Sequence, residues 1–169
     1  MYLYLVRHAA AGEPDPARWP DDRDRPLTPD GDEQFREVAA GLAELVPTVD
    51  VVLSSPLVRA LQTAAILEKK AGWPAALHFD ALEPGAQPQD VLDALLPHAT
   101  ASSIALVGHE PTLHELASYL LTGDAATVAI SMRTGGVVCL STEDGAPRAG
   151  RALLEWAVHP RILRAITSR

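Results

Sequence analysis

The sequence alternates short apolar segments, rich in β-forming residues, with longer segments whose apolar residues recur at helical spacing. Each apolar segment predicts a buried strand, and each longer segment predicts a helix. The predicted strand and helix pairs are 2–6 with 29–46, 50–54 with 57–72, 76–79 with 88–96, and 104–107 with 111–123. Such a chain buries its strands by forming a mostly parallel sheet covered by helices on both faces.

The C-terminal part of the sequence departs from this alternation. Two strands are predicted in succession, over about 137–141 and 151–157, with a turn at Glu143-Asp144-Gly145 between them, which is typical of an antiparallel hairpin. We therefore predict a three-layer α/β/α sandwich whose mostly parallel sheet contains one antiparallel strand. At 169 residues, without a repeat or a linker, the chain is expected to form a single domain over 1–169.

Charge and cysteine content exclude several classes of function. The chain has 14 Lys and Arg against 22 Asp and Glu, a net charge of -8, so no overall positive field attracts nucleic acid or an anionic membrane. Cys139 is the single cysteine and is expected to be a small buried hydrophobic residue. The apolar N-terminal run stops at Arg7, too short for a signal peptide, which predicts a cytoplasmic protein.

Unusual polar residues follow three of the predicted strands. The first strand ends in Arg7-His8, the second in Ser54-Ser55-Pro56 with Arg59 shortly after, and the fourth in Gly108-His109-Glu110. Ligands of open α/β sheets bind beyond the carboxyl ends of the strands. We therefore expect two histidines and two arginines to converge at one edge of the sheet.

These residue types favour an anion over a metal ion. Guanidinium groups beside the imidazoles would repel a divalent cation, so we predict neither a metal site nor a cofactor. Arginine binds phosphate through paired hydrogen bonds, and imidazole can attack phosphorus and later leave it. The cluster therefore indicates phosphoryl transfer with histidine as the nucleophile.

Four motifs carry a family resemblance. They are Leu5-Val6-Arg7-His8, Asp24-Arg25-Pro26-Leu27-Thr28, the segment from Ser54 to Ala64, and Val107-Gly108-His109-Glu110-Pro111. Together and in this order they resemble the histidine phosphatase superfamily, which has the phosphoglycerate-mutase-like fold. Within it the short chain is similar to the SixA-type phosphohistidine phosphatases. The resemblance implies that His8 becomes phosphorylated and that Arg7, Arg59 and His109 complete the phosphate pocket.

The sequence departs from the family pattern at two positions: Ala9 stands where Gly usually follows Arg-His, and Glu110 stands where Asn usually follows Gly-His. Many family members place a proton donor soon after the third strand, and Glu83 is the nearest candidate, with Asp80 a lesser one. Glu83 could equally be an exposed loop carboxylate. Arg25 could contact a distal part of the substrate or be a solvated loop charge.

Other polar residues are assigned ordinary roles. Ser54 and Ser55 lack the surroundings of a serine nucleophile, so helix capping and turn formation are expected of them. The remaining histidines are interpreted as structural or surface residues: His78, His98, His114 and His159. The acidic segment from Glu13 to Asp24 is either a solvated loop or a rim that disfavours highly anionic substrates.

Three functions are compatible with these observations. The leading one is a metal-independent phosphatase acting on phosphohistidine or another protein-borne phosphoryl group, because only residues 83–87 separate the third strand region from Pro88 and leave the pocket open. The second keeps this chemistry for a small phosphomonoester. The third is a catalytically weak module that binds phosphate or a phosphoprotein.

Overall fold

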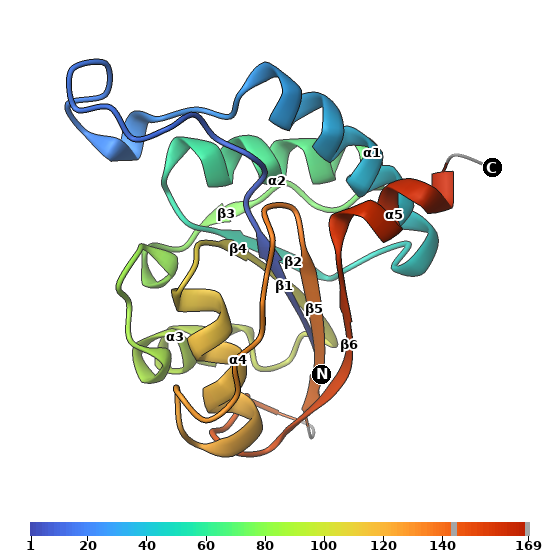
Figure 1. The fold of residues 1–169 in the computed structure, drawn as a ribbon. Coiled ribbons are helices and arrows are strands. Elements are labelled where there is room, and N and C mark those ends of the chain that lie inside the picture. The colour runs from blue at the N-terminus through green and yellow to red at the C-terminus, as the bar shows by residue number, and fades with distance from the viewer. Residues whose placement is uncertain (143–144, 168–169) are drawn as a thin grey trace.

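The computed structural model describes residues 1–142 and 145–167 (Figure 1). The strands are β1 (Tyr2–Arg7), β2 (Val51–Ser54), β3 (Leu77–His78), β4 (Ser103–Gly108), β5 (Val137–Thr142) and β6 (Ala152–Val158). The α-helices are α1 (Pro29–Leu45), α2 (Val58–Ala71), α3 (Pro88–Leu95), α4 (Thr112–Thr122) and α5 (Pro160–Thr167). Short 3₁₀ helices are η1 (Asp22–Asp24), η2 (Asp80–Leu82) and η3 (Leu96–His98).

The strands of the described residues form one sheet in the order β3-β2-β4-β1-β5-β6. The pairs β2–β3, β2–β4 and β1–β4 are parallel, whereas β5 runs antiparallel to both of its neighbours, β1 and β6. The predicted α/β fold with one antiparallel strand is therefore confirmed. In the register, Arg7 lies opposite Gly108 and Ser54 lies opposite Val107, so β1, β2 and β4 end at the same edge.

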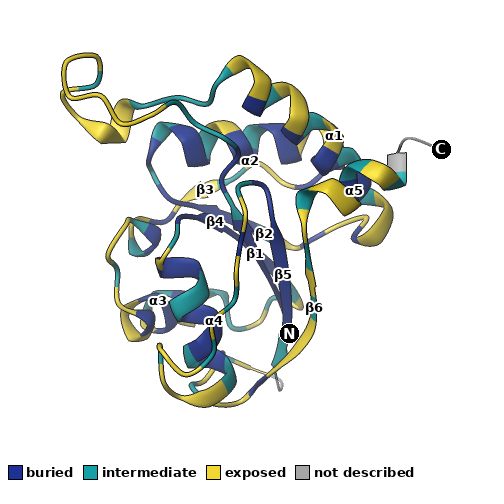
Figure 2. Cartoon of the chain, viewed as in Figure 1, coloured by how far each residue is buried: buried dark blue, intermediate teal, exposed yellow. Residues whose placement is uncertain are grey.

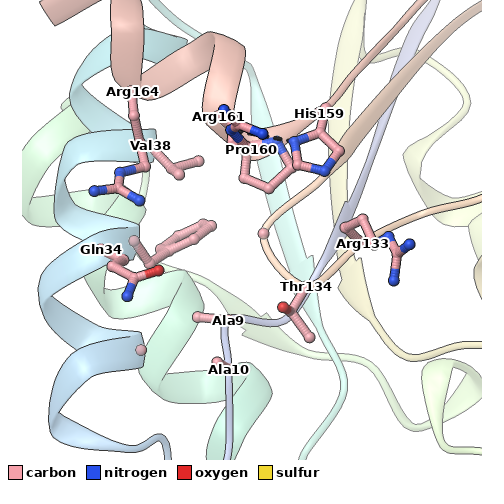
Figure 3. A pocket seen from close by; sticks show the side chains of 13 residues that line it. Ala9, Ala10, Gln34, Val38, Arg133, Thr134, His159, Pro160, Arg161 and Arg164 are labelled. Carbon is pink, nitrogen blue, oxygen red and sulfur yellow. Dashed lines mark hydrogen bonds between the residues drawn. The ribbon is translucent and has the colours of Figure 1, made fainter.

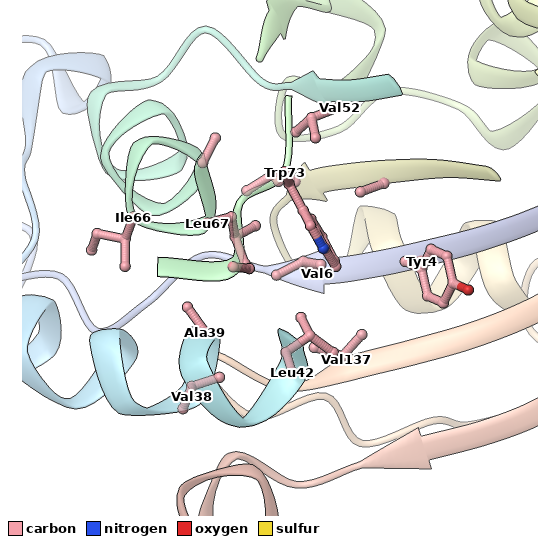
Figure 4. Packing of buried hydrophobic residues seen from close by; sticks show 14 of the residues in the cluster. Tyr4, Val6, Val38, Ala39, Leu42, Val52, Ile66, Leu67, Trp73 and Val137 are labelled. Carbon is pink, nitrogen blue, oxygen red and sulfur yellow. The ribbon is translucent and has the colours of Figure 1, made fainter. Parts of the chain in front are cut away.

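Helices cover both faces of the sheet and make three layers (Figure 1). Alternate residues of β1 point to opposite faces: Tyr4 and Val6 join a core with α1, α2 and α5, while Leu3 and Leu5 join a core with α3 and α4. Figure 2 shows the central strands buried between helices whose outer faces are exposed, whereas the edge strand β6 is largely exposed. Trp73 stands in the first core beside Val6 and Leu67 (Figure 4), and its indole N–H donates to the Val46 carbonyl at 3.0 Å.

Local sequence signals explain where the first helix begins. Thr28 caps α1, because its Oγ1 accepts from the Gly31 N–H at 2.9 Å, and Pro29 follows at the first helical position. The predicted helix over 29–46 is thus confirmed to within one residue. The buried Cys139 also agrees with its prediction.

Two features differ from the predictions. Ser55 does not cap α2, because the helix begins at Val58 after Leu57 and has no side-chain cap. The turn role expected of Ser55 is present, since its Oγ accepts from the Leu57 N–H at 3.4 Å, and the same hydroxyl also bonds His109. Helix α5 was not predicted, since its eight residues directly follow a strand and give only two turns of periodicity. The predicted turn at 143–145 includes residues 143 and 144, which lie outside the described part of the chain.

No helix within residues 1–142 and 145–167 combines the length and the apolar character needed to cross a lipid bilayer.

Candidate active site

Three parallel strands deliver the central side chains of the site. Backbone hydrogen bonds continue the sheet beyond the strand ends: the His8 N–H donates to the Gly108 carbonyl at 3.0 Å and the Ser55 N–H to the Val107 carbonyl at 2.9 Å. The rings of His8 and His109 consequently lie with their centroids 5.0 Å apart, tilted by 54°. The juxtaposition follows from the strand register and needs no long loop.

His8 is held in one tautomer by its own backbone neighbour. Its Nδ1 lies 2.7 Å from the Ala9 carbonyl, which can only accept, so Nδ1 carries the hydrogen and Nε2 keeps its lone pair. Burial above all, together with the positive charges of Arg59, Arg7 and Arg25, lowers the pKa of His8 to about 4 against the opposing effect of the Ala9 bond. The ring is therefore neutral near pH 7, as a nucleophile must be.

Thr63 of α2 fixes the segment that orients His8. The Ala9 N–H donates to Thr63 Oγ1 at 3.0 Å, and this hydroxyl donates to the Arg59 carbonyl at 2.7 Å. Ala9 is buried and, like every described non-glycine residue, has no positive φ. The alanine therefore takes the usual glycine position here without backbone strain.

Arg7 is half-buried and Arg59 is buried, and each keeps a hydrogen-bond donor unused. Arg7 donates through Nη1 to the Met132 carbonyl at 2.6 Å, and Arg59 donates through Nη1 to the Asp22 carbonyl at 2.8 Å. The Nε of each arginine is buried and has no hydrogen-bond partner within the described residues. Buried donors without partners are rare in proteins, and an anion bound beside them would satisfy both.

His109 also has a buried ring nitrogen without a hydrogen-bond partner among the described residues. Its Nε2 lies 2.8 Å from the Ser55 hydroxyl, while its Nδ1 is buried without a partner among the described residues. Burial, reinforced by His8 and Arg59, lowers the pKa of His109 to about 3, so the ring is neutral. When the Ser55 hydroxyl donates to Nε2, the hydrogen resides on Nδ1, which then becomes a third unused donor.

These groups surround one cavity of about 380 Å³. Of the candidate residues named from the sequence, those that line it are Arg7, His8, Arg25, Arg59 and His109. Glu83 does not line it, although its neighbour Pro84 does. The Glu83 carboxylate instead forms a two-pronged ion pair with Arg23, at 2.5 and 3.0 Å, and Asp80 begins the 3₁₀ helix η2.

Asp22 is a cavity residue that sequence reasoning missed. Its carboxylate lies 2.7 Å from Arg25 Nε and 3.0 Å from Arg59 Nη2, so it bridges the two guanidinium groups. The hydrogen bond from Arg25, together with the charge of Arg59, holds the pKa of Asp22 below its usual value. Several acids share this loop, and only the path of the loop decides which of them reaches Arg59.

Glu110 also lines the cavity. One carboxylate oxygen lies 2.5 Å from His114 Nδ1, and the other is buried without a partner in the described part of the chain. His114, interpreted from sequence as structural, is thus the hydrogen-bond partner of a cavity residue. Within the described residues, no group of three or more His, Cys, Asp or Glu side chains is placed to hold a metal ion.

Comparisons with known proteins agree with this geometry. The family model for the histidine phosphatase superfamily, branch 1, matches residues 3–83. A candidate phosphohistidine phosphatase SixA from Nakamurella multipartitia, whose structure is known, is 32% identical to this chain. The match covers 94% of this chain and 95% of that one, with a TM-score of 0.76. The chain belongs to the histidine phosphatase superfamily.

Two further proteins are similar to this chain. An uncharacterized protein from Picosynechococcus is 34% identical over 146 residues, which are 83% of this chain and 84% of that protein. A protein histidine phosphatase SixA solved with tungstate has the same fold, with a TM-score of 0.82 at 23% identity over 96% of this chain and 99% of that one.

Proposed function

We propose that this member of the histidine phosphatase superfamily hydrolyses a protein-borne phosphoryl group, phosphohistidine above all, through a phosphorylated intermediate on His8. The observation that carries the proposal is the state of His8. Its Nδ1 is occupied by the Ala9 carbonyl, its Nε2 is unbonded among the described residues, and Arg7 and Arg59 line the same cavity with spare donors.

The reaction has two steps. In the first, the His8 Nε2 lone pair forms a bond to phosphorus while the bond from phosphorus to the leaving nitrogen or oxygen breaks, and the leaving group takes up a proton, for which Glu83 is the proposed donor. In the second, water attacks phosphorus and the bond from phosphorus to Nε2 breaks. One proton of the water returns to the donor, and inorganic phosphate and neutral imidazole are formed. Arg7, Arg59 and His109 stabilise the negative charge of the phosphoryl oxygens in both transition states.

The shape of the rim supports a protein substrate. Only residues 83–87 connect η2 to α3, and of these Pro84 lines the cavity, so this connection places no helix over it. A phosphorylated side chain on another protein could enter from this side. The cavity of about 380 Å³ would also admit a small phosphomonoester, which is the alternative substrate class.

The nucleophile is tested with His8→Ala. We expect the rate to fall by several orders of magnitude, and label from the substrate to be trapped on His8 of the wild-type protein in an acid-labile, base-stable form. His78→Ala is the matched control, since His78 is an exposed histidine outside the cavity. Undiminished activity in His8→Ala would overturn the proposal.

The substrate class is tested by comparing hydrolysis rates for a phosphorylated histidine-containing carrier domain, an aryl phosphate and a panel of phosphorylated metabolites. We expect the carrier domain to have the highest kcat/KM. A metabolite that surpasses it would favour the small-molecule alternative. A protein that turns over none of them but binds phosphate would be a binding module.

The proposed mechanism uses side-chain cations only, so activity should survive exhaustive chelation. Activity that chelation abolishes and one divalent ion restores would contradict this mechanism.

Arg59→Ala should lower the rate by roughly 10² to 10³, the usual effect of removing a charge-assisted donor from a reacting oxyanion.

A further inference from the structure

A second cavity of about 220 Å³ adjoins the catalytic one (Figure 3). It opens between the N-terminal parts of α1 and α5, and Ala10 and Thr134 line both cavities. The wall between them is tied to the catalytic strand, because the Gly135 N–H donates to the carbonyls of Arg7 and His8 at 3.1 and 3.2 Å. A ligand bound in one cavity therefore lies next to a ligand bound in the other.

The lining of this second cavity, which we call the arginine pocket, contrasts with the acidic character of the chain. Three arginines, Arg133, Arg161 and Arg164, border it together with His159, and none of the residues lining it is an Asp or Glu. Arg164 pairs with Glu37 at 2.6 Å. Arg133 and Arg161 have no ion-pair partner within the described residues.

The floor of the arginine pocket is apolar. Phe35, with 2% of its surface exposed, lines the pocket together with Val38 and Pro160, and a Cβ on Gly135 would lie 3.2 Å from the Phe35 ring. At the rim, His159 accepts the Arg161 backbone N–H on Nδ1 at 3.2 Å, which leaves Nε2 as the donor of the neutral ring. The pocket thus joins an apolar base to cationic and donor groups above it.

We propose that the arginine pocket binds a carboxylate side chain, flanked by an apolar residue, of the protein segment that carries the phosphoryl group. This inference rests on the proposed function and names the kind of partner it serves. Arginine binds carboxylates through paired hydrogen bonds, and the apolar floor accommodates the stem or the neighbour of the acid. Because the cavities share Ala10 and Thr134, residues a few positions apart in one extended segment could occupy both.

The test uses two phosphohistidine peptides that differ only in flanking residues: one carries Glu and Leu, the other Gln and Leu. For the variant with Arg133→Ala and Arg161→Ala together, we expect KM for the acidic peptide to rise roughly 10-fold with kcat unchanged. Hydrolysis of the Gln peptide should change less than 2-fold. The matched control combines Arg148→Ala and Arg151→Ala, two exposed arginines that precede β6, whose other end borders the pocket.

Introducing a negative charge into the arginine pocket gives an independent readout. Gln34 is an exposed residue of α1 that lines the arginine pocket, so Gln34→Glu should also raise KM for the acidic peptide and spare the Gln peptide. Equal kinetics of the two peptides in wild type and in both variants would overturn the inference.

Binding measurements separate failure of the inference from failure of the proposed function. In a His8→Ala background, fluorescence polarisation should show tighter binding of the acidic peptide, and the two arginine substitutions should abolish the difference. If wild type hydrolyses neither peptide but this binding difference persists, the phosphatase proposal fails and the pocket stands. If both are hydrolysed and bound without distinction, the pocket assignment fails and the phosphatase stands.

Discussion

His8 combines two properties that usually oppose each other, burial and reactivity. Its Nδ1–H donates to the Ala9 carbonyl, and burial together with the adjacent arginines keeps the ring from gaining a second proton. In the proposed mechanism, the same positive charges attract the phosphate that the ring attacks. At the scale of single residues, the cavity would then favour both the neutral nucleophile and its anionic substrate.

The lowered pKa of His8 predicts its titration. An ordinary histidine gains a proton near pH 6.5, but His8, with a pKa of about 4, should stay neutral down to about pH 5. Nitrogen NMR of the labelled protein, with the His8 signal assigned by its loss in His8→Ala, should place the midpoint near 4. A His8 midpoint near 6.5 would show that its surroundings do not suppress the charged form.

The proton source is a second prediction at this scale, and we retain Glu83 as the proposed donor. Its ion pair with Arg23 lies outside the cavity, so the pair must open for Glu83 to reach a leaving group. Glu83→Gln should then slow hydrolysis of an alkyl phosphate by roughly 10² to 10⁴ and of phosphohistidine far less, since an imidazole is the less basic leaving group. Glu110→Gln is the comparison, because Glu110 already lines the cavity. A loss that depends on the leaving group in Glu110→Gln, and not in Glu83→Gln, would reverse the assignment.

Among the elements, α5 depends on close contact with α1. A Cβ at Gly41 would lie 1.9 Å from the Leu163 carbonyl oxygen, so only glycine lets the helices approach at this point. The contact also holds Pro160 and Arg161, the first residues of α5, over the arginine pocket.

Gly41→Ala should therefore displace α5. We expect a loss of about 1–3 kcal/mol in the free energy of unfolding, typical of overpacking a tight contact, measured by urea denaturation. Gly12→Ala is the control, because a Cβ there meets no atom within 4 Å. Equal stability of the two variants would mean that α5 adapts to the added methyl group at little cost.

The sequence predicts elements where periodicity and caps are strong, and α1 with its Thr28 cap is the clearest case. The meeting of His8 and His109 could be anticipated from apolar strands and the rule that parallel strands end together. Contacts set by loop path or exact register could not be anticipated. Three examples are the ion pair between Asp22 and Arg59, the hydrogen bond between Ser55 and His109, and the ion pair between Glu83 and Arg23.

At the scale of the whole molecule, the two buried histidines of the site make the free energy of unfolding depend on pH. The pKa values of His8 and His109 are about 4 and about 3 in the folded protein, both below the unfolded value of 6.5. Between the folded and the unfolded pKa of each histidine, the unfolded chain binds more protons than the folded protein. The free energy of unfolding therefore falls as the pH falls.

We expect each histidine to contribute a loss of up to about 3 kcal/mol in unfolding free energy between pH 6.5 and pH 4. Urea denaturation across this range measures the slope, and His109→Asn should flatten it. A pH dependence unaltered by His109→Asn would refute the assignment of a lowered pKa to His109.

Tungstate or phosphate, by binding the folded state only, should raise Tm in wild type and much less in Arg59→Ala.

The bridge that Asp22 makes between Arg25 and Arg59 has a consequence for turnover. The carboxylate is an internal counter-ion, so the arriving dianion exchanges with it and does not enter an uncompensated field of positive charge. When inorganic phosphate departs, Asp22 can take its place on Arg59, and the departing product leaves no bare guanidinium behind. In the proposed mechanism, the loop that carries Asp22 would therefore favour the release of phosphate from a site rich in positive charge.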